Sequence, residues 1–226
     1  MIESIQNALS NGWYLLSWLM LVIVSLFILV CDLRTSNSHI GSLMQAVWFL
    51  TVLYSGPIGL SLYYISGRRQ IRRDSIWRKG IRSVTHCYSG CGAGEVTGVL
   101  IAAGLLNLGN TAVAISTFCF AYFFGYGMTL GPLLQAGVSL KRALIDTFYA
   151  DTLTIAVMEL TAISLDLWLA ANASMNQVLF WGSLILSLTA GQLAAYPVNV
   201  LLVVLGVKQG MGDPRETDSH GHSHAH

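Results

Sequence analysis

The chain has 226 residues, of which 54% are hydrophobic and only 10% are charged, and its formal net charge is +1. A soluble domain carries about 25% charged residues, so this composition excludes an ordinary soluble globular protein. The near-neutral balance gives no global attraction to nucleic acid, and the charges are clustered between long apolar segments. The composition therefore predicts an integral protein of the lipid bilayer with an all-α transmembrane bundle.

Six segments are predicted to be transmembrane helices. About 20 mostly apolar residues cross the roughly 30 Å of hydrocarbon in a bilayer. Four segments meet this requirement easily, and two weaker ones contain glycines or acidic residues. The six predicted spans are 13–31, 43–66, 87–108, 111–131, 149–170 and 179–206. We expect a kink at Gly56–Pro57 in the second span and another at Pro197 in the sixth.

The positive charges indicate how this bundle is oriented. Lys and Arg accumulate in loops on the cytoplasmic side of a membrane. A basic cytoplasmic loop is expected over residues 67–85, between the second and third predicted spans. Six spans leave only Arg34 on the opposite side. We therefore predict that residues 1–207 form the transmembrane domain and that both chain ends are cytoplasmic.

The third predicted span begins with a cluster of residue types that bind metals. His86 and Cys87 are followed by Cys91 and Glu95, and the last three are spaced i, i+4, i+8. This spacing places them on one face of a helix. Imidazole, thiolate and carboxylate together suit a transition metal, and ionisable residues within a span usually mark a functional site. A tightly packed glycine-rich helix and a redox-active cysteine pair are the alternatives.

The fifth predicted span carries a second set with matching spacing. Asp151 and Glu159 are eight residues apart, as are Cys87 and Glu95, and eight residues of helix rise about 12 Å. Because both spans should run outward, Cys87 and Asp151 should share one depth, while both glutamates approach the midplane. Two carboxylates that close can share a proton or jointly hold a cation. Met158 adds a candidate thioether ligand.

A faint internal repeat relates these two spans. The tripeptide Glu-Val-Thr at Glu95 resembles Glu-Leu-Thr at Glu159, and each precedes another span. This predicts two similar hairpins, formed by the third and fourth spans and by the fifth and sixth, around a central site. Milder polar residues either line a pathway or join helices by hydrogen bonds. These candidates are Thr97, Tyr122, Tyr126, Thr161, Gln192, Tyr196 and Asn199.

The C-terminal segment, residues 208–226, is expected to be a flexible cytoplasmic tail. Its alternating histidines are His220, His222, His224 and His226. Histidines in a polar tract are typical of metal binding. We therefore predict that the tail captures metal as an auxiliary to the intramembrane site, with a remnant of an affinity tag as the alternative.

The sequence resembles a known family over about residues 80–211. The motifs that carry the resemblance are the His-Cys-x3-Cys-x2-Gly-Glu block from His86 to Glu95, the segment Ala150–Glu159, Tyr196-Pro-Val-Asn199 and Gly206-Val-Lys-x-Gly-Met211. The family is a group of small bacterial inner-membrane proteins that is defined only as a domain of unknown function. Some members carry copper-related labels, so the resemblance implies metal handling in the cell inner membrane. The family usually has Asp where this chain has Glu95.

Together these patterns predict a membrane protein that binds and transports a transition-metal cation between the third and fifth spans. The expected ligands are His86, Cys87, Cys91, Glu95, Asp151, Met158 and Glu159. The soft sulfur ligands in this set favour copper(I), with zinc and iron(II) next. Protons are the candidate coupling ion, and a homo-oligomer is compatible with the sequence.

Two other functions remain open from the sequence. One is a thiol–disulfide oxidoreductase that uses Cys87 and Cys91 with a quinone, because one helical turn between two cysteines permits a disulfide. The other is a metal sensor or assembly factor that does not transport. Metal content separates the first alternative from the transporter, and flux separates the second.

Overall fold

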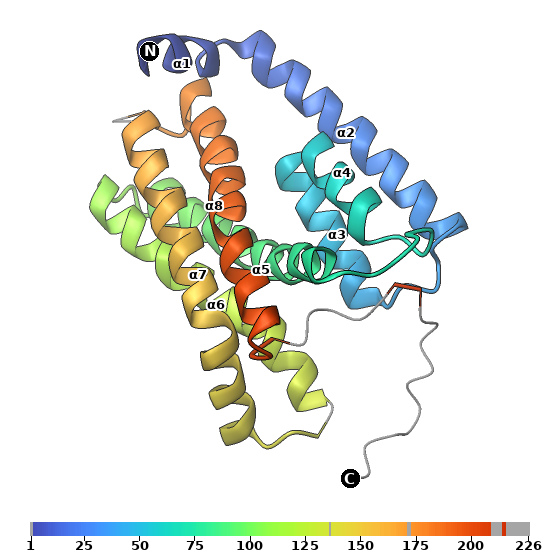
Figure 1. Ribbon diagram of the computed structural model, residues 1–226. Helices are drawn as coiled ribbons and strands as arrows, with labels where there is room; N and C mark the ends of the chain where they lie inside the picture. Colours follow the sequence, from blue (N-terminus) through green and yellow to red (C-terminus); the bar gives the residue numbers. More distant parts are fainter. Residues whose placement is uncertain (1, 136, 171–172, 209–213, 216–226) are drawn as a thin grey trace.

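The computed structural model describes residues 2–135, 137–170, 173–208 and 214–215. Within these ranges the chain is helical and contains no strand (Figure 1). The helices are α1 (Ile2–Leu9), α2 (Gly12–Thr35), α3 (Ser42–Ser55), α4 (Pro57–Ser66), α5 (Ile76–Val99), the π-helix η1 (Leu100–Leu105), α6 (Asn110–Gln135), α7 (Leu140–Ala170) and α8 (Val178–Val204). The all-α fold class is therefore confirmed.

Four of these helices, α2, α6, α7 and α8, are long and apolar enough to cross a membrane. Large apolar side chains lie on the outside of the bundle, among them Trp13, Phe27 and Phe123, which are at least 70% exposed. An apolar surface of this extent marks contact with a membrane or a partner. Length and surface together identify a membrane-embedded protein.

The second predicted span, 43–66, is a helical hairpin and not one kinked helix. The chain reverses between α3 and α4 at Gly56, which adopts a φ of +53°. The ring centroids of Trp48 and Tyr63 are 5.4 Å apart, whereas a continuous helix would separate these residues by about 22 Å. With 14 and 10 residues, neither helix reaches the length that a membrane span needs.

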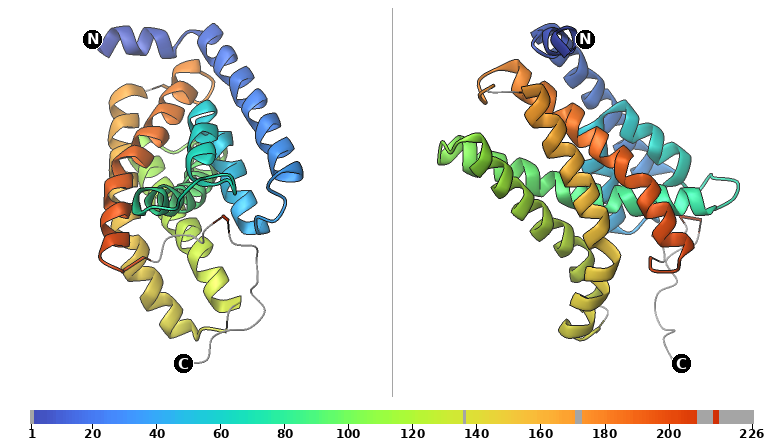
Figure 2. Two further views of the ribbon diagram at one scale, coloured as in Figure 1. Left: turned by 45° about the vertical axis from the view of Figure 1, so that its right-hand side comes forward. Right: turned by 60° about the vertical axis from the view of Figure 1, so that its left-hand side comes forward.

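Because α3 and α4 form a hairpin, the segments that lie at each end of the bundle differ from those in the predicted six-span arrangement. The first helix, α1, lies beside the α7–α8 connection, where Gln6 Nε2 donates to the Leu169 carbonyl oxygen (3.0 Å). At the opposite end, His39 Nε2 lies 2.7 Å from the Pro214 carbonyl oxygen. Figure 2 shows α1 and the end of α8 at opposite ends of the bundle. The described beginning of the chain and the end of α8 therefore lie at opposite ends of the bundle.

The 12 Lys and Arg residues of the chain lie at the end of α2, before and in the first turns of α5, at the start of α7 and after α8. These segments meet at one end of the bundle, which we call the basic end. Arg34 lies in the last turn of α2, and its neighbour Asp32 forms a salt bridge with Arg68 (2.7 Å). Arg34 is therefore beside the basic loop and not alone on the far side. That loop is shorter than the predicted 67–85, because α5 already begins at Ile76 after its N-cap Ser75.

The helices α5 and α6 pack as one pair and α7 and α8 as another, as the repeat predicts. Glycines allow the close approach within each pair. A Cβ atom on Gly94 of α5 would collide with the α6 backbone at Phe120, and one on Gly191 of α8 would lie 2.7 Å from the Met158 carbonyl oxygen. These contacts hold the polar faces of α5 and α7 at the centre of the molecule.

Candidate functional site

The polar face of α5 is turned into the bundle. His86, Cys87, Cys91 and Glu95 are all buried, with at most 6% of any of them exposed. Since residues four apart lie on one side of a helix, the three spaced i, i+4, i+8 form one buried line. The predicted polar face of α5 therefore lies in the interior of the bundle, where its side chains can bind a ligand or contact other helices.

At the basic end of this line, Cys87 meets Asp151 of α7 and Lys208, which follows α8. The Cys87 thiol donates to Asp151 Oδ1 at 3.3 Å. Lys208 Nζ lies 2.8 Å from the same Asp151 oxygen and 3.3 Å from the Cys87 sulfur. Cys87 and Asp151 therefore share one depth, as their equal spacing to the two glutamates predicts.

Further polar groups complete the surroundings of the Lys208 ammonium. Its Nζ donates to Asn199 Oδ1 at 2.9 Å and to Thr154 Oγ1 at 3.4 Å, and Ser83 Oγ donates to the same Asn199 oxygen at 2.9 Å. Burial lowers the pKa of Lys208, but Cys87 and Asp151 raise it by more, so it lies above its ordinary value. The ammonium is therefore held as a cation.

Midway along the bundle, Glu159 of α7 is fully buried. Neither of its carboxylate oxygens has a partner with hydrogen-bond geometry, and the same holds for both side-chain polar atoms of Gln192 on α8. Cys91 and Glu95 are nevertheless close enough to Glu159 to interact with it electrostatically. Buried polar groups normally have partners, so Glu159 and Gln192 are candidates to bind a ligand.

The predicted ligands do not converge on one point. Within the described ranges, no three His, Cys, Asp or Glu side chains form a group that could hold a metal ion. Instead, Cys87 and Asp151 lie near the basic end, Met158 and Glu159 lie in the middle, and Glu95 faces the opposite end. The single site expected from the sequence is therefore a series of groups along the bundle.

Two cavities approach this series from opposite ends. The inner cavity, at the basic end, has a volume of about 520 Å³ and is lined by His86, Cys87, Asp151 and Lys208 among others. The outer cavity, at the other end, has a volume of about 420 Å³ and is lined by Glu95. The packed side chains between the two include those of Cys91, Ala121, Ile155, Met158 and Leu188.

The seven candidate pathway residues divide into two groups. Asn199 belongs to the Lys208 network and Gln192 is buried near the centre. The other five make hydrogen bonds within or between helices. These are Thr97 to Ala93, Thr161 to Val157, Tyr122 and Tyr126 to Thr152, and Tyr196 to Trp77. The hydrogen-bonding interpretation therefore describes most of this set.

Sequence reasoning missed two residues of the candidate site. Lys208 was assigned to the flexible tail, yet it is buried against α5 and α7. Its place in the Gly206-Val-Lys motif was the signal that could have found it. Asp166, an acid within the fifth predicted span, lines the outer cavity. The tail histidines from His220 onward lie outside the described residues.

The comparisons with known proteins give a family without an assigned activity. The family described as "Domain of unknown function (DUF4396)" matches residues 76–208. This range covers more than half of the chain, agrees with the resemblance over about 80–211, and contains every residue of the series from Cys87 to Lys208. No curated protein and no solved structure matches the chain.

Proposed function

We propose that this chain, which belongs to the DUF4396 family, binds a transition-metal cation inside its helical bundle and carries it across the membrane. The observation that supports this most directly is the position of the Lys208 ammonium between Cys87, Asp151 and Asn199. These groups already surround a positive charge in a buried site. The ammonium stands where a bound cation would sit.

The donor atoms around this position favour a soft metal. Cys87 supplies a sulfur and Asp151 a carboxylate. His86 lines the same inner cavity, and its Nδ1 atom is buried without a hydrogen-bond partner. Sulfur and imidazole ligands select copper(I) or zinc over hard cations. Copper(I) is therefore the proposed cargo, with zinc and iron(II) next.

A route across the bundle follows from the two cavities. The inner cavity reaches Cys87 and Asp151, and the outer cavity reaches Glu95. From Asp151 to Ile163, where α7 meets the outer cavity, the helix rises about 18 Å. Cys91, Met158 and Glu159 lie in the packed region between, so they are the proposed relay. Transport requires that this packing opens to each cavity in turn.

The membrane topology that fits the fold has five crossings, by α2, α5, α6, α7 and α8. The hairpin α3–α4 enters from the basic end and returns to it. Because positive charge stays in the cytoplasm, the basic end with all 12 Lys and Arg is the cytoplasmic one. The N-terminal helix α1 is then on the outside, in the inner membrane of a bacterium as the resemblance implies.

Purified protein in proteoliposomes tests this function. Wild type should transport copper(I) or zinc, and Cys87→Ser or Asp151→Asn should abolish most of that flux. Cys119→Ser is the matched control, because Cys119 is an exposed thiol on α6 outside the site. Metal that binds without flux would favour the sensor or assembly factor. Absence of metal, with oxidation of the Cys87 and Cys91 thiols to a disulfide that reduces a quinone to its quinol, would favour the oxidoreductase.

A further inference from the structure

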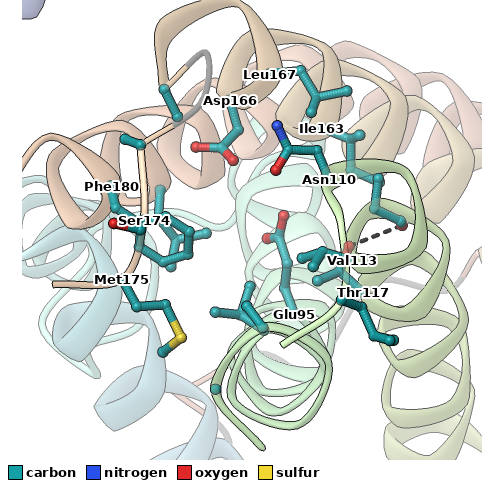
Figure 3. A pocket seen from close by; sticks show the side chains of 18 of the residues that line it. Glu95, Asn110, Val113, Thr117, Ile163, Asp166, Leu167, Ser174, Met175 and Phe180 are labelled. Atoms are coloured by element: carbon teal, nitrogen blue, oxygen red, sulfur yellow. Dashed lines mark hydrogen bonds between the residues drawn. The ribbon is translucent and has the colours of Figure 1, made fainter. Parts of the chain in front are cut away.

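The outer cavity contains polar groups that the soft-metal site does not use. Glu95 reaches it from α5, Asn110 from the first turn of α6 and Asp166 from α7. Figure 3 shows both carboxylates and the Asn110 amide directed into the same space. With a volume of about 420 Å³, the cavity has room for an ion with part of its hydration shell, since one water occupies about 30 Å³.

Glu95 has the features of a ligand without its cation. Only 2% of the residue is exposed, and its Oε2 atom is buried without a hydrogen-bond partner. A buried carboxylate normally has a partner, because leaving it unpaired in a medium of low dielectric constant is costly. The unpartnered carboxylate is therefore an observation that points to a bound group in the cavity.

The charges around the cavity indicate that the bound group is positive. Glu95 and Asp166 are close enough to interact electrostatically, and two negative charges at close range repel each other. Ser183 Oγ donates to Asp166 Oδ1 at 2.7 Å, which satisfies one oxygen only. Among the described residues that line the cavity there is no Lys, Arg or His. No side chain of the lining supplies the missing positive charge.

We propose that the outer cavity binds a hard divalent cation between the carboxylates of Glu95 and Asp166, with Asn110 as a third oxygen ligand. Carboxylate, amide and water oxygens suit Mg²⁺, Ca²⁺ and Mn²⁺. Mg²⁺ in particular keeps several waters and uses only one or two carboxylates. The site therefore needs no group of three acidic side chains. It contains no cysteine among its described lining residues, which separates it from the inner cavity with Cys87.

Mn²⁺ binding to the full-length protein in nanodiscs, followed by electron paramagnetic resonance, tests the proposal. Wild type should bind one Mn²⁺ that Mg²⁺ or Ca²⁺ displaces. Glu95→Gln and Asp166→Asn should each weaken binding by at least about tenfold, since each removes a direct ligand. Glu3→Gln is the matched control, because Glu3 is an exposed acid on α1 at the same end of the bundle.

A second readout keeps the test independent of folding and of the proposed function. Without divalent ions, both variants should unfold at or above the wild-type temperature, because each relieves carboxylate repulsion. Mn²⁺ should stabilise wild type and Glu3→Gln but neither cavity variant. Unchanged Mn²⁺ affinity in both cavity variants, or an equal loss in Glu3→Gln, overturns the site. The Cys87→Ser variant should keep Mn²⁺ binding, so failure of the soft-metal function leaves this result intact.

Discussion

Lys208 Nζ and Asp151 Oδ1 are 2.8 Å apart, so the segment after α8 is joined to the first half of α7, at the basic end, by a buried ion pair. The pair does two things at once. It compensates the Asp151 charge, which could not otherwise be buried without large cost, and it fills the position proposed for the metal. A metal that enters this site must displace the ammonium.

Replacing Lys208 should therefore lower the free energy of unfolding and raise the affinity for metal. In Lys208→Gln, Asp151 loses its counter-charge, and breaking a buried pair costs about 3–5 kcal/mol. Copper(I) or zinc should bind at least about tenfold more tightly and restore most of the lost stability, because binding stabilises the folded state. Thermal unfolding with and without metal measures both effects. Lys141→Gln, at an exposed lysine near the start of α7, should change neither.

Accessibility of single cysteines should distinguish five crossings from six. The segment between α2 and α3 lies at the basic end, so a cysteine at Ser38 should be protected from a membrane-impermeant maleimide in intact cells. A cysteine at Asn176, in the α7–α8 connection, should react. Both positions are exposed in the structure. Labelling of both from outside would restore the six-span arrangement, which places residue 38 on the outer face.

The close contact between α5 and α6 should make Gly94 intolerant of any side chain. A Cβ atom there would collide with the backbone at Phe120, and overpacking of this kind costs about 1–3 kcal/mol. Gly94→Ala should lower the unfolding temperature in detergent. Gly127→Ala is the control, because no atom lies within 4 Å of its added Cβ. In that helical position alanine should be neutral or stabilising, by up to about 1 kcal/mol.

The histidine tail should act as an auxiliary. Deleting residues 217–226 removes His220, His222, His224 and His226 and leaves Lys208 and both cavities in place. Histidines at alternate positions raise the local concentration of metal, so the deletion should reduce uptake only at low metal concentration. At saturating metal, the truncated protein should bind less metal than the full-length protein only by the amount that the tail binds. Loss of all bound metal would show that the intramembrane series is not a site.

The parts of the fold that the sequence predicts are those that depend on one helix at a time. Apolar length is enough to find α2, α6, α7 and α8. Equal spacing on two helices that run in the same direction is enough to place Cys87 beside Asp151. Both inferences need only the rise and the period of an α-helix. They therefore hold without any knowledge of the tertiary contacts.

The parts that the sequence did not predict depend on contacts between distant segments. Residues 43–66 form an apolar run long enough to span, and only the packing of Trp48 on Tyr63 shows that the chain turns back at Gly56. Lys208 appears as a charge beyond the last span until α8 brings it to Asp151. The separation of Glu95 from Cys87 into two cavities likewise depends on how α6 and α7 pack around α5. Spacing along one helix carries none of this information.

The concentration of all Lys and Arg at the basic end also has an electrical consequence. In the orientation proposed above, a cation that moves from the outer cavity to Asp151 moves towards the cytoplasm, down the inside-negative potential of an energised membrane. Each elementary charge that crosses 100 mV releases about 2.3 kcal/mol. In that orientation the basic groups lie in the region of low potential, and the acidic outer cavity faces the region of high potential. With this polarity, voltage alone would load the bundle from outside and drive its cargo inward.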